Sequence, residues 1–250
     1  MILIKNAEVY APEYLGKKDI LLSYDRILQV DDHIDCSLPN VTIIEAEGKI
    51  VTPGFIDSHS HGDGSVRKKP LMECIVEQGI TTAITGQCGS SIYPDPALGP
   101  DQSAKEFFDS LKAGASGMNY ALLVGHSALR KTVMGKSMEE PTREQMDQMK
   151  KLLADGMKEG AMGLSLGLGY VPSVYSKKEE LIELAKVAKE YGGILAAHIR
   201  NESDLVVEAV QEFIDVAVAA GVVGVISHFK ACKVRNHGKV VQMIERVDKA

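Results

Sequence analysis

The chain has no tryptophan, an aromatic content of only 5% and no apolar run long enough to span a membrane. Its longest run, residues 216–227, is shorter than the roughly 20 residues that a membrane helix needs. Residues 1–5 lack the charged and then apolar layout of a secretory signal. We therefore expect a cytoplasmic protein with no membrane partner.

There is also little excess charge, with 28 Lys and Arg against 34 Asp and Glu and a net charge of −6. No basic face is expected for a nucleic acid, so small molecules are the expected partners. The four cysteines stand at irregular, distant positions, which excludes a disulfide framework. Each is a reduced thiol, either buried or a metal ligand: Cys36, Cys74, Cys88 and Cys232.

What is present is an ordinary globular composition, 45% apolar and 25% charged, which excludes disorder. Residues 1–50 hold short apolar or alternating runs separated by turn residues, and they predict part of a small β domain. From residue 51 to residue 250, short apolar runs alternate with amphipathic stretches. This second domain is predicted to be a repeated βα structure, either a doubly wound sheet or a (β/α)8 barrel.

Six buried strands are predicted in the second domain, near residues 54–57, 81–85, 120–124, 161–166, 194–197 and 222–226. One helix begins at Pro141 and ends before Gly160, and its methionines recur at helical spacing. These methionines are predicted to face the core. Another helix is predicted over residues 176–191.

The first strand ends in a His-x-His motif, His59 and His61. Side chains at i and i+2 of a strand point to one face, so both imidazoles can reach one metal ion. His126, His198 and His228 also stand at or just after the ends of predicted strands. In a (β/α)8 barrel these ends share one rim, where active sites are built.

Cys88 follows the second strand and is flanked by Gly86 and Gly89, which allow close backbone approach. A thiolate there is a good zinc ligand. Cys74 lies in a helical run and is expected to be a small buried hydrophobe. Cys36 and Cys232 have no histidine at ligand spacing and are not expected to bind metal.

Together these motifs resemble the D-aminoacylase (N-acyl-D-amino-acid deacylase) branch of the amidohydrolase superfamily. The resemblance extends over the whole chain and is carried by residues 53–63, 79–89, 124–126, 160–165, 198–202 and 227–230. It implies a metal-centred (β/α)8 barrel flanked by a small β domain made from both chain ends. A dinucleotide fold is disfavoured because no Gly-x-Gly-x-x-Gly motif opens a helix after the first strand.

The resemblance assigns Cys88, His198 and His228 to a tightly held Zn²⁺, and His59 and His61 to a second, weaker metal site. Many superfamily members bridge two metals with a carboxylated lysine on the fourth strand. Residues 163–167 offer no lysine, which fits the branch in which cysteine bridges. Zinc of this kind activates water for attack on an amide carbonyl.

The resemblance also matches Lys230 to a lysine that pairs with the substrate carboxylate, and Arg200 and Tyr170 are candidates for the same pocket. Glu202 is expected to orient His198 or to begin the next helix. The general acid is an Asp after the eighth strand, which we expect beyond Ala250. The preference for D substrates rests on the resemblance alone, and the residues specify neither the acyl group nor the preferred side chain.

Only six barrel strands are predicted, so we expect a truncated chain with little deacylase activity and with exposed sheet edges that favour self-association. Two alternatives remain open. One is a related amidohydrolase acting on a cyclic amide or a dipeptide, like dihydroorotase or isoaspartyl dipeptidase. The other is a non-catalytic metal-binding fragment.

Overall fold

The computed structural model describes residues 1–35, 39–95 and 103–250, so Cys36 lies outside the described residues. The chain divides into two compact units, Met1–Phe55 and Ile56–Ala250. No helix in the described part of the chain has the length and apolar character needed to cross a membrane.

The first unit is a five-stranded sheet in which β1 lies between β2 and β4. Its strands are β1 (Ile2–Tyr10), β2 (Tyr14–Ser23), β3 (Arg26–Asp31), β4 (Thr42–Glu45) and β5 (Ile50–Val51). The β1–β2 and β2–β3 pairs are antiparallel, whereas β4 and β5 run parallel to β1. Alternate residues of β1, Leu3, Ala7 and Val9 among them, are buried, because successive side chains of a strand point to opposite faces.

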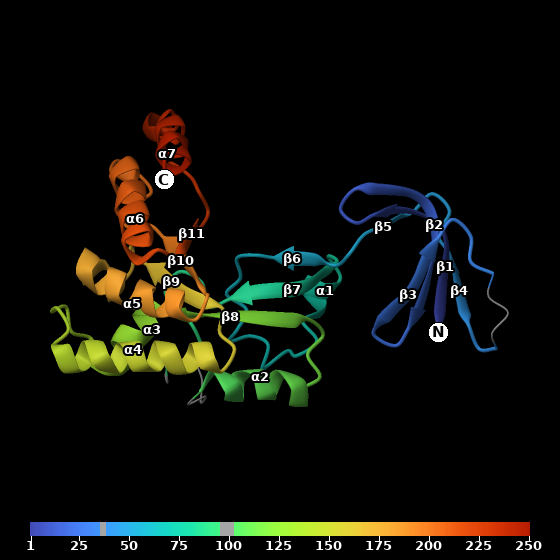
Figure 1. Ribbon diagram of the computed structural model, residues 1–250, viewed down its shortest axis with the longest axis horizontal. Helices are drawn as coiled ribbons and strands as arrows, with labels where there is room; N and C mark the ends of the chain where they lie inside the picture. Colours follow the sequence, from blue (N-terminus) through green and yellow to red (C-terminus); the bar gives the residue numbers. More distant parts are fainter. Residues whose placement is uncertain (36–38, 96–102) are drawn as a thin grey trace. The chain divides into compact units, whose positions relative to one another are not determined.

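The second unit contains a six-stranded sheet in the order β11-β10-β9-β8-β7-β6, and the pairs from β7 to β11 are parallel (Figure 1). The strands are β6 (Phe55–Asp57), β7 (Ile80–Thr85), β8 (Asn119–Gly125), β9 (Gly163–Gly167), β10 (Ile194–His198) and β11 (Val223–Ile226). These are the six strands predicted from apolar runs. Sequential order in a parallel sheet brings the carboxyl end of every strand to one edge.

Helical segments connect the strands of this sheet (Figure 1). They are α1 (Glu73–Val76), α2 (Ala104–Ala113), α3 (His126–Met134), α4 (Arg143–Lys158), α5 (Lys178–Glu190), α6 (Val206–Ala220) and α7 (Lys239–Asp248), with 3-10 turns η1 (Ser173–Tyr175) and η2 (Val234–Asn236). The start of α4 is fixed by a capping box between Thr142 and Gln145. Met146, Met149 and Met157 are buried, as their spacing predicted.

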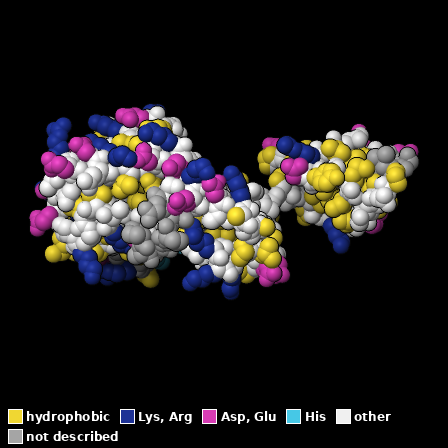
Figure 2. Space-filling view, turned by 90° about the horizontal axis from the view of Figure 1, so that it is seen from below, with side chains coloured by type: hydrophobic (Ala, Val, Ile, Leu, Met, Phe, Trp, Pro, Cys, Tyr) yellow, Lys and Arg dark blue, Asp and Glu magenta, His cyan; other side chains and the backbone are white. Residues whose placement is uncertain are grey.

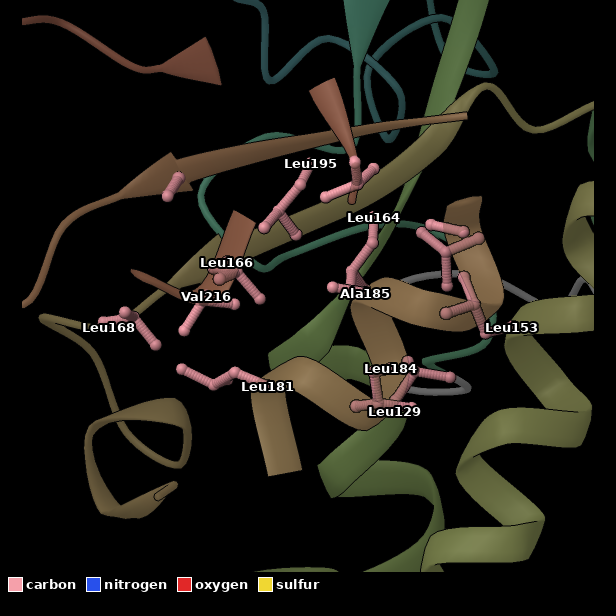
Figure 3. Packing of buried hydrophobic residues seen from close by; sticks show 14 of the residues in the cluster. Leu129, Leu153, Leu164, Leu166, Leu168, Leu181, Leu184, Ala185, Leu195 and Val216 are labelled. Carbon is pink, nitrogen blue, oxygen red and sulfur yellow. The ribbon is translucent and has the colours of Figure 1, made fainter. Parts of the chain in front are cut away.

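The core of the second unit lies between the central strands and the helices that cover them. Leu164 and Leu166 of β9 and Leu195 of β10 belong to one buried cluster with Leu181 and Leu184 of α5 (Figure 3). All five are 0% exposed. Burial of a leucine contributes about 1.5–3 kcal/mol, so this layer fixes β9 and β10 against α5.

Two details differ from expectation. Cys74 is exposed, so the expectation of a buried thiol is wrong: the run around it forms only the single turn α1, which buries no residue. The expectation that the strand near residues 222–226 is buried is also wrong: Val223 and Val225 of β11 are exposed, because β11 is the last strand in the sheet order and, among the described residues, lacks a neighbour on one side. Self-association through this edge stays a prediction. On the face seen in Figure 2, basic and acidic side chains are interspersed over the second unit.

Candidate metal centre

The predicted ligands lie at the carboxyl ends of four strands in the parallel sheet. His59 and His61 follow β6, Cys88 follows β7, His198 is the last residue of β10, and His228 stands just after β11. Strands far apart in sequence therefore supply one cluster. This is the rim at which α/β barrels build active sites.

The side chains of four of these residues form a chain of close contacts. Cys88 Sγ lies 3.4 Å from His59 Nε2 and 3.6 Å from His228 Nε2. His228 Nε2 in turn lies 3.1 Å from His198 Nδ1. The His61 ring stands edge-on to the His59 ring, with the ring centres 5.4 Å apart. Among the described residues, ligand atoms of His59, Cys88 and His228 all lie within 4.8 Å of one another, and so do those of His198, Glu202 and His228. His228 is common to both groups, whereas His61 adjoins the first group through its ring contact with His59.

These distances suit zinc. Bond lengths of about 2.3 Å to sulfur and about 2.05 Å to nitrogen place tetrahedral sulfur and nitrogen ligands about 3.6 Å apart and two nitrogens about 3.3 Å apart. The separations of Cys88 Sγ from His59 and His228, and that of His228 from His198, are close to these values. A thiolate with imidazoles is also the donor set that zinc prefers. The residues present therefore fit a zinc ion.

The backbone at two ligands is held in a conformation that ordinary residues avoid. Cys88 has φ +53° and His228 has φ +35°, and such positions cost about 1–3 kcal/mol each unless the surrounding structure enforces them. Packing around Cys88 is tight, because a Cβ added at Gly167 would lie 2.0 Å from the Cys88 carbonyl oxygen. The close contact of β9 with this turn keeps the thiol turned toward the histidines.

Burial shifts the pKa values of the cluster. Burial raises the pKa of Cys88 to about 11, and the negative charge of Glu202 raises it further. Burial also lowers the pKa of His59, as do the neighbouring His228 and His61. The pKa of His198 is lowered by burial as well, although the charge of Glu202 acts in the opposite direction. In the absence of a metal the site therefore favours a neutral thiol beside neutral His59 and His198 rings.

Glu202 connects the histidines to Lys230. Its Oε1 lies 2.6 Å from His228 Nδ1 and 2.7 Å from Lys230 Nζ, but 3.9 Å from His198 Nδ1. Lys230 Nζ also donates a hydrogen bond to His228 Nδ1 at 3.0 Å, so His228 contacts both members of the Glu202–Lys230 ion pair through the ring nitrogen that faces away from Cys88. Burial alone would raise the pKa of Glu202, but Lys230 and both histidines hold it below its usual value. The residue thus orients His228 more directly than His198.

The other predicted pocket residues lie in different settings. The Tyr170 ring packs on the His198 ring with 4.5 Å between ring centres, and its hydroxyl lies 3.4 Å from His198 Nδ1. The Arg200 guanidinium is instead bound to Glu212 and to backbone carbonyls of the loop that follows β9. Among the predicted residues, Lys230 and Tyr170 therefore join the cluster, whereas these contacts commit Arg200 elsewhere.

His126 is buried in a separate polar network. Its Nδ1 lies 2.7 Å from Ser173 Oγ and its Nε2 lies 2.8 Å from Glu180 Oε1. Sequence reasoning did not connect these three residues, because they are 47 and 54 positions apart. Cys232 is half-buried and its backbone N–H donates to the Glu202 carbonyl, so it supports the loop of Glu202 through its main chain.

A parallel βα sheet with a thiol–imidazole cluster at its carboxyl edge is the arrangement expected of a metal-binding (β/α)-barrel protein. Within this class, the model of the amidohydrolase family matches residues 42–241. The chain belongs to the amidohydrolase family.

Curated relatives give the same assignment. The chain is 34% identical over 247 residues to the N-acyl-D-glutamate deacylase of Alcaligenes xylosoxydans xylosoxydans, covering 94% of this chain and 50% of the relative. It is 32% identical to the D-aminoacylase of the same organism, covering 94% of this chain and 51% of that protein. The chain thus spans about half the length of the curated relatives it matches.

A solved structure is similar over nearly the whole chain. The N-acyl-D-glutamate deacylase from Bordetella bronchiseptica, complexed with zinc and a phosphonate inhibitor, superposes with a TM-score of 0.91. Its sequence is 31% identical, and the match covers 99% of this chain and 55% of that one. The six-stranded sheet described above therefore has the amidohydrolase fold of the D-aminoacylases, as the sequence predicted.

Proposed function

We propose that the protein acts as a zinc-dependent amidohydrolase that hydrolyses the amide bond of N-acyl-D-amino acids. The observation that carries the proposal is the approach of Cys88 Sγ to two imidazole nitrogens, at 3.4 and 3.6 Å. The similarity to deacylases supports the choice of reaction. Zinc, when bound, supplies a Lewis acid for the amide carbonyl and lowers the pKa of a water toward about 7.

In this proposal Cys88, His198 and His228 hold the tightly bound zinc, and His59 and His61 form a weaker site that shares Cys88. The pairwise approaches of Cys88 to His228 and of His228 to His198 support the first set. The approach of Cys88 to His59 supports sharing of the thiolate. The first set would hold one tightly bound zinc ion, and the second set would form a weaker site.

Lys230 is proposed to bind the carboxylate of the substrate. Its side chain is 46% exposed and its ammonium group is paired with Glu202 beside His228. A carboxylate that replaces this partner would lie next to the metal ligands, with the Tyr170 hydroxyl on the His198 side of the cluster. The proposed substrate partner is therefore a small molecule with a carboxylate.

The test compares N-acetyl-D-amino acids with their L forms, dihydroorotate and a β-aspartyl dipeptide, using the zinc-loaded full-length protein. We expect turnover of D substrates, and in Lys230→Met a KM about tenfold higher because a charge-assisted hydrogen bond is lost. Lys233→Met is the control. Lys233 is an exposed lysine on the same β11–α7 connection as Lys230, and its ammonium group is paired with Asp204. Hydrolysis of dihydroorotate or the dipeptide in preference to D substrates contradicts the proposal.

A further inference from the structure

The connection from β9 to α5, residues 168–176, carries Tyr170 and is called here the Tyr170 arm. It is neither a strand nor an α-helix apart from the short turn η1. Leu168 at its start is buried, and its backbone N–H donates to the His198 carbonyl. The rest of the arm is attached to the sheet and helices through two polar networks that the proposed chemistry leaves unused.

The first network holds the arm at Ser173. The Ser173 hydroxyl lies 2.7 Å from His126 Nδ1 and 2.6 Å from the Ser127 hydroxyl. His126 Nε2 donates to one oxygen of Glu180, and Arg130 donates to the other at 2.6 Å. Burial alone would raise the pKa of Glu180, but His126 and Arg130 hold it below its usual value, so the carboxylate stays charged.

The order Ser173, His126, Glu180 matches that of a serine hydrolase triad, yet the site offers no access to a substrate. Ser173 and His126 are 0% exposed and Glu180 is 4% exposed. A nucleophilic serine must reach an acyl carbon at about 3 Å, and no such approach is open here. The network therefore fixes structure rather than attacking a substrate.

The second network holds the arm one residue further on. Arg200 Nε and Nη2 both donate to the Glu212 carboxylate, at 2.9 and 3.0 Å. Its Nη1 donates to the Val174 carbonyl at 2.7 Å and its Nη2 to the Ser176 carbonyl at 3.1 Å. The planar guanidinium group of Arg200 thus joins Glu212 of α6 to two backbone carbonyls of the Tyr170 arm.

These anchors act on Tyr170 through one turn of backbone. The Val174 N–H donates to the Tyr170 carbonyl at 2.8 Å, so Tyr170 moves with the anchored Val174. The Tyr170 side chain is 49% exposed, and in the described structure its own contacts with the cluster are those to His198. A half-exposed ring with so few contacts needs its backbone fixed to keep one position.

We propose that His126 and Arg200 are positioning residues that hold the Tyr170 arm so that the Tyr170 hydroxyl stays beside His198 at the metal centre. The benefit to catalysis rests on the proposed function, because a hydroxyl held in place before substrate arrives need not be ordered during the reaction. This assigns Arg200 to the support of the pocket rather than to contact with the substrate.

The test uses the metal-free chain labelled with 3-fluorotyrosine and followed by fluorine NMR. The resonance of Tyr170 is identified by its loss in Tyr170→Phe. In Arg200→Met we expect this resonance to move toward the position of free fluorotyrosine, and the Val174 and Ser176 amides to exchange about tenfold faster with deuterium. His126→Asn should have the same two effects.

Arg246→Met is the matched control, since Arg246 is an exposed arginine bonded to Gln211 between α6 and α7, and it should change neither signal. The buried Tyr93 resonance reports whether each variant is folded. If Arg200→Met fails to fold, Arg200→Lys decides, because it keeps the charge and loses the planar guanidinium group, and a smaller shift in the same direction is expected.

An unchanged Tyr170 resonance with unchanged amide exchange in a folded Arg200 variant overturns the inference. A shift of the Tyr170 resonance in Arg246→Met as large as that in Arg200→Met also overturns it. Such a shift would show that the resonance does not depend on the contacts that hold the Tyr170 arm. The measurement needs no metal, so it stays informative even if zinc binding at Cys88 fails, and the two proposals are tested independently.

Discussion

Cys88 is a thiol whose surroundings oppose its ionisation until a metal is present. Burial raises its pKa to about 11, and zinc binds the thiolate. The His59 and His198 rings, whose pKa values burial lowers, are neutral near pH 7 and bring no proton to be displaced. Metal binding and deprotonation of one thiol are therefore coupled at this site.

We predict that binding of one zinc ion at pH 7.5 releases about one proton, and that the affinity rises about tenfold per pH unit between pH 7.5 and the thiol pKa. The sign follows from competition: as the pH falls, protons occupy the sulfur and the affinity falls. Titration calorimetry in two buffers of different ionisation enthalpy measures the release. A value near zero would contradict the raised pKa.

Glu202 acts at the same scale through its contacts with His228 Nδ1 and Lys230 Nζ. In Glu202→Ala we predict zinc binding that is weaker by about 10- to 100-fold, because the His228 ring and the lysine that donates to it lose the carboxylate that orients them. Glu208→Ala, an exposed carboxylate on α6, is the control and should leave the affinity unchanged. Competition with a chromophoric chelator gives both affinities. Equal affinities in the two variants would show that Glu202 does not orient His228.

At the scale of elements, β9 sets the position of the Cys88 turn by direct contact. Gly167→Ala would place a methyl group 2.0 Å from the Cys88 carbonyl oxygen, and we predict a loss of about 1–3 kcal/mol in stability and weaker zinc binding. Gly238→Ala, where a Cβ meets no atom within 4 Å, is the control. Thermal unfolding and chelator competition check both effects. Unaltered zinc binding in the Gly167 variant would show that β9 does not position the thiol.

The elements themselves were largely predictable, because buried parallel strands such as β8, β9 and β10 are continuous apolar runs. The grouping of His59, Cys88, His198 and His228 was predictable as well, since all follow strand ends. What the sequence did not reveal are contacts made by loops: the left-handed backbone at Cys88 and His228 follows no residue pattern.

The contacts of Arg200 were also not predictable from the sequence. Its partner Glu212 lies 12 residues away, and its other acceptors are backbone carbonyls. Backbone acceptors leave no trace in side-chain identity, so an arginine that fastens a loop looks in sequence like a free cation near the pocket. The contacts themselves, visible only in three dimensions, separate the two roles.

At the scale of the whole molecule, the site belongs to one compact unit. All of the proposed ligands, together with Lys230 and Tyr170, lie in Ile56–Ala250, and they come from the edge of one sheet. The chain spans about half the length of its curated relatives, and it holds five candidate metal ligands. Metal binding is therefore the property that tests the proposed metal centre most directly.

The decisive measurement is the zinc content of the purified chain and of Cys88→Ala, determined by inductively coupled plasma mass spectrometry after dialysis against metal-free buffer. Cys74→Ala, which removes an exposed thiol, is the control. We predict one tightly retained zinc ion in the unaltered chain and in Cys74→Ala, and none in Cys88→Ala. The same zinc content in all three proteins would contradict the assignment of Cys88 as a ligand and the metal centre built on it.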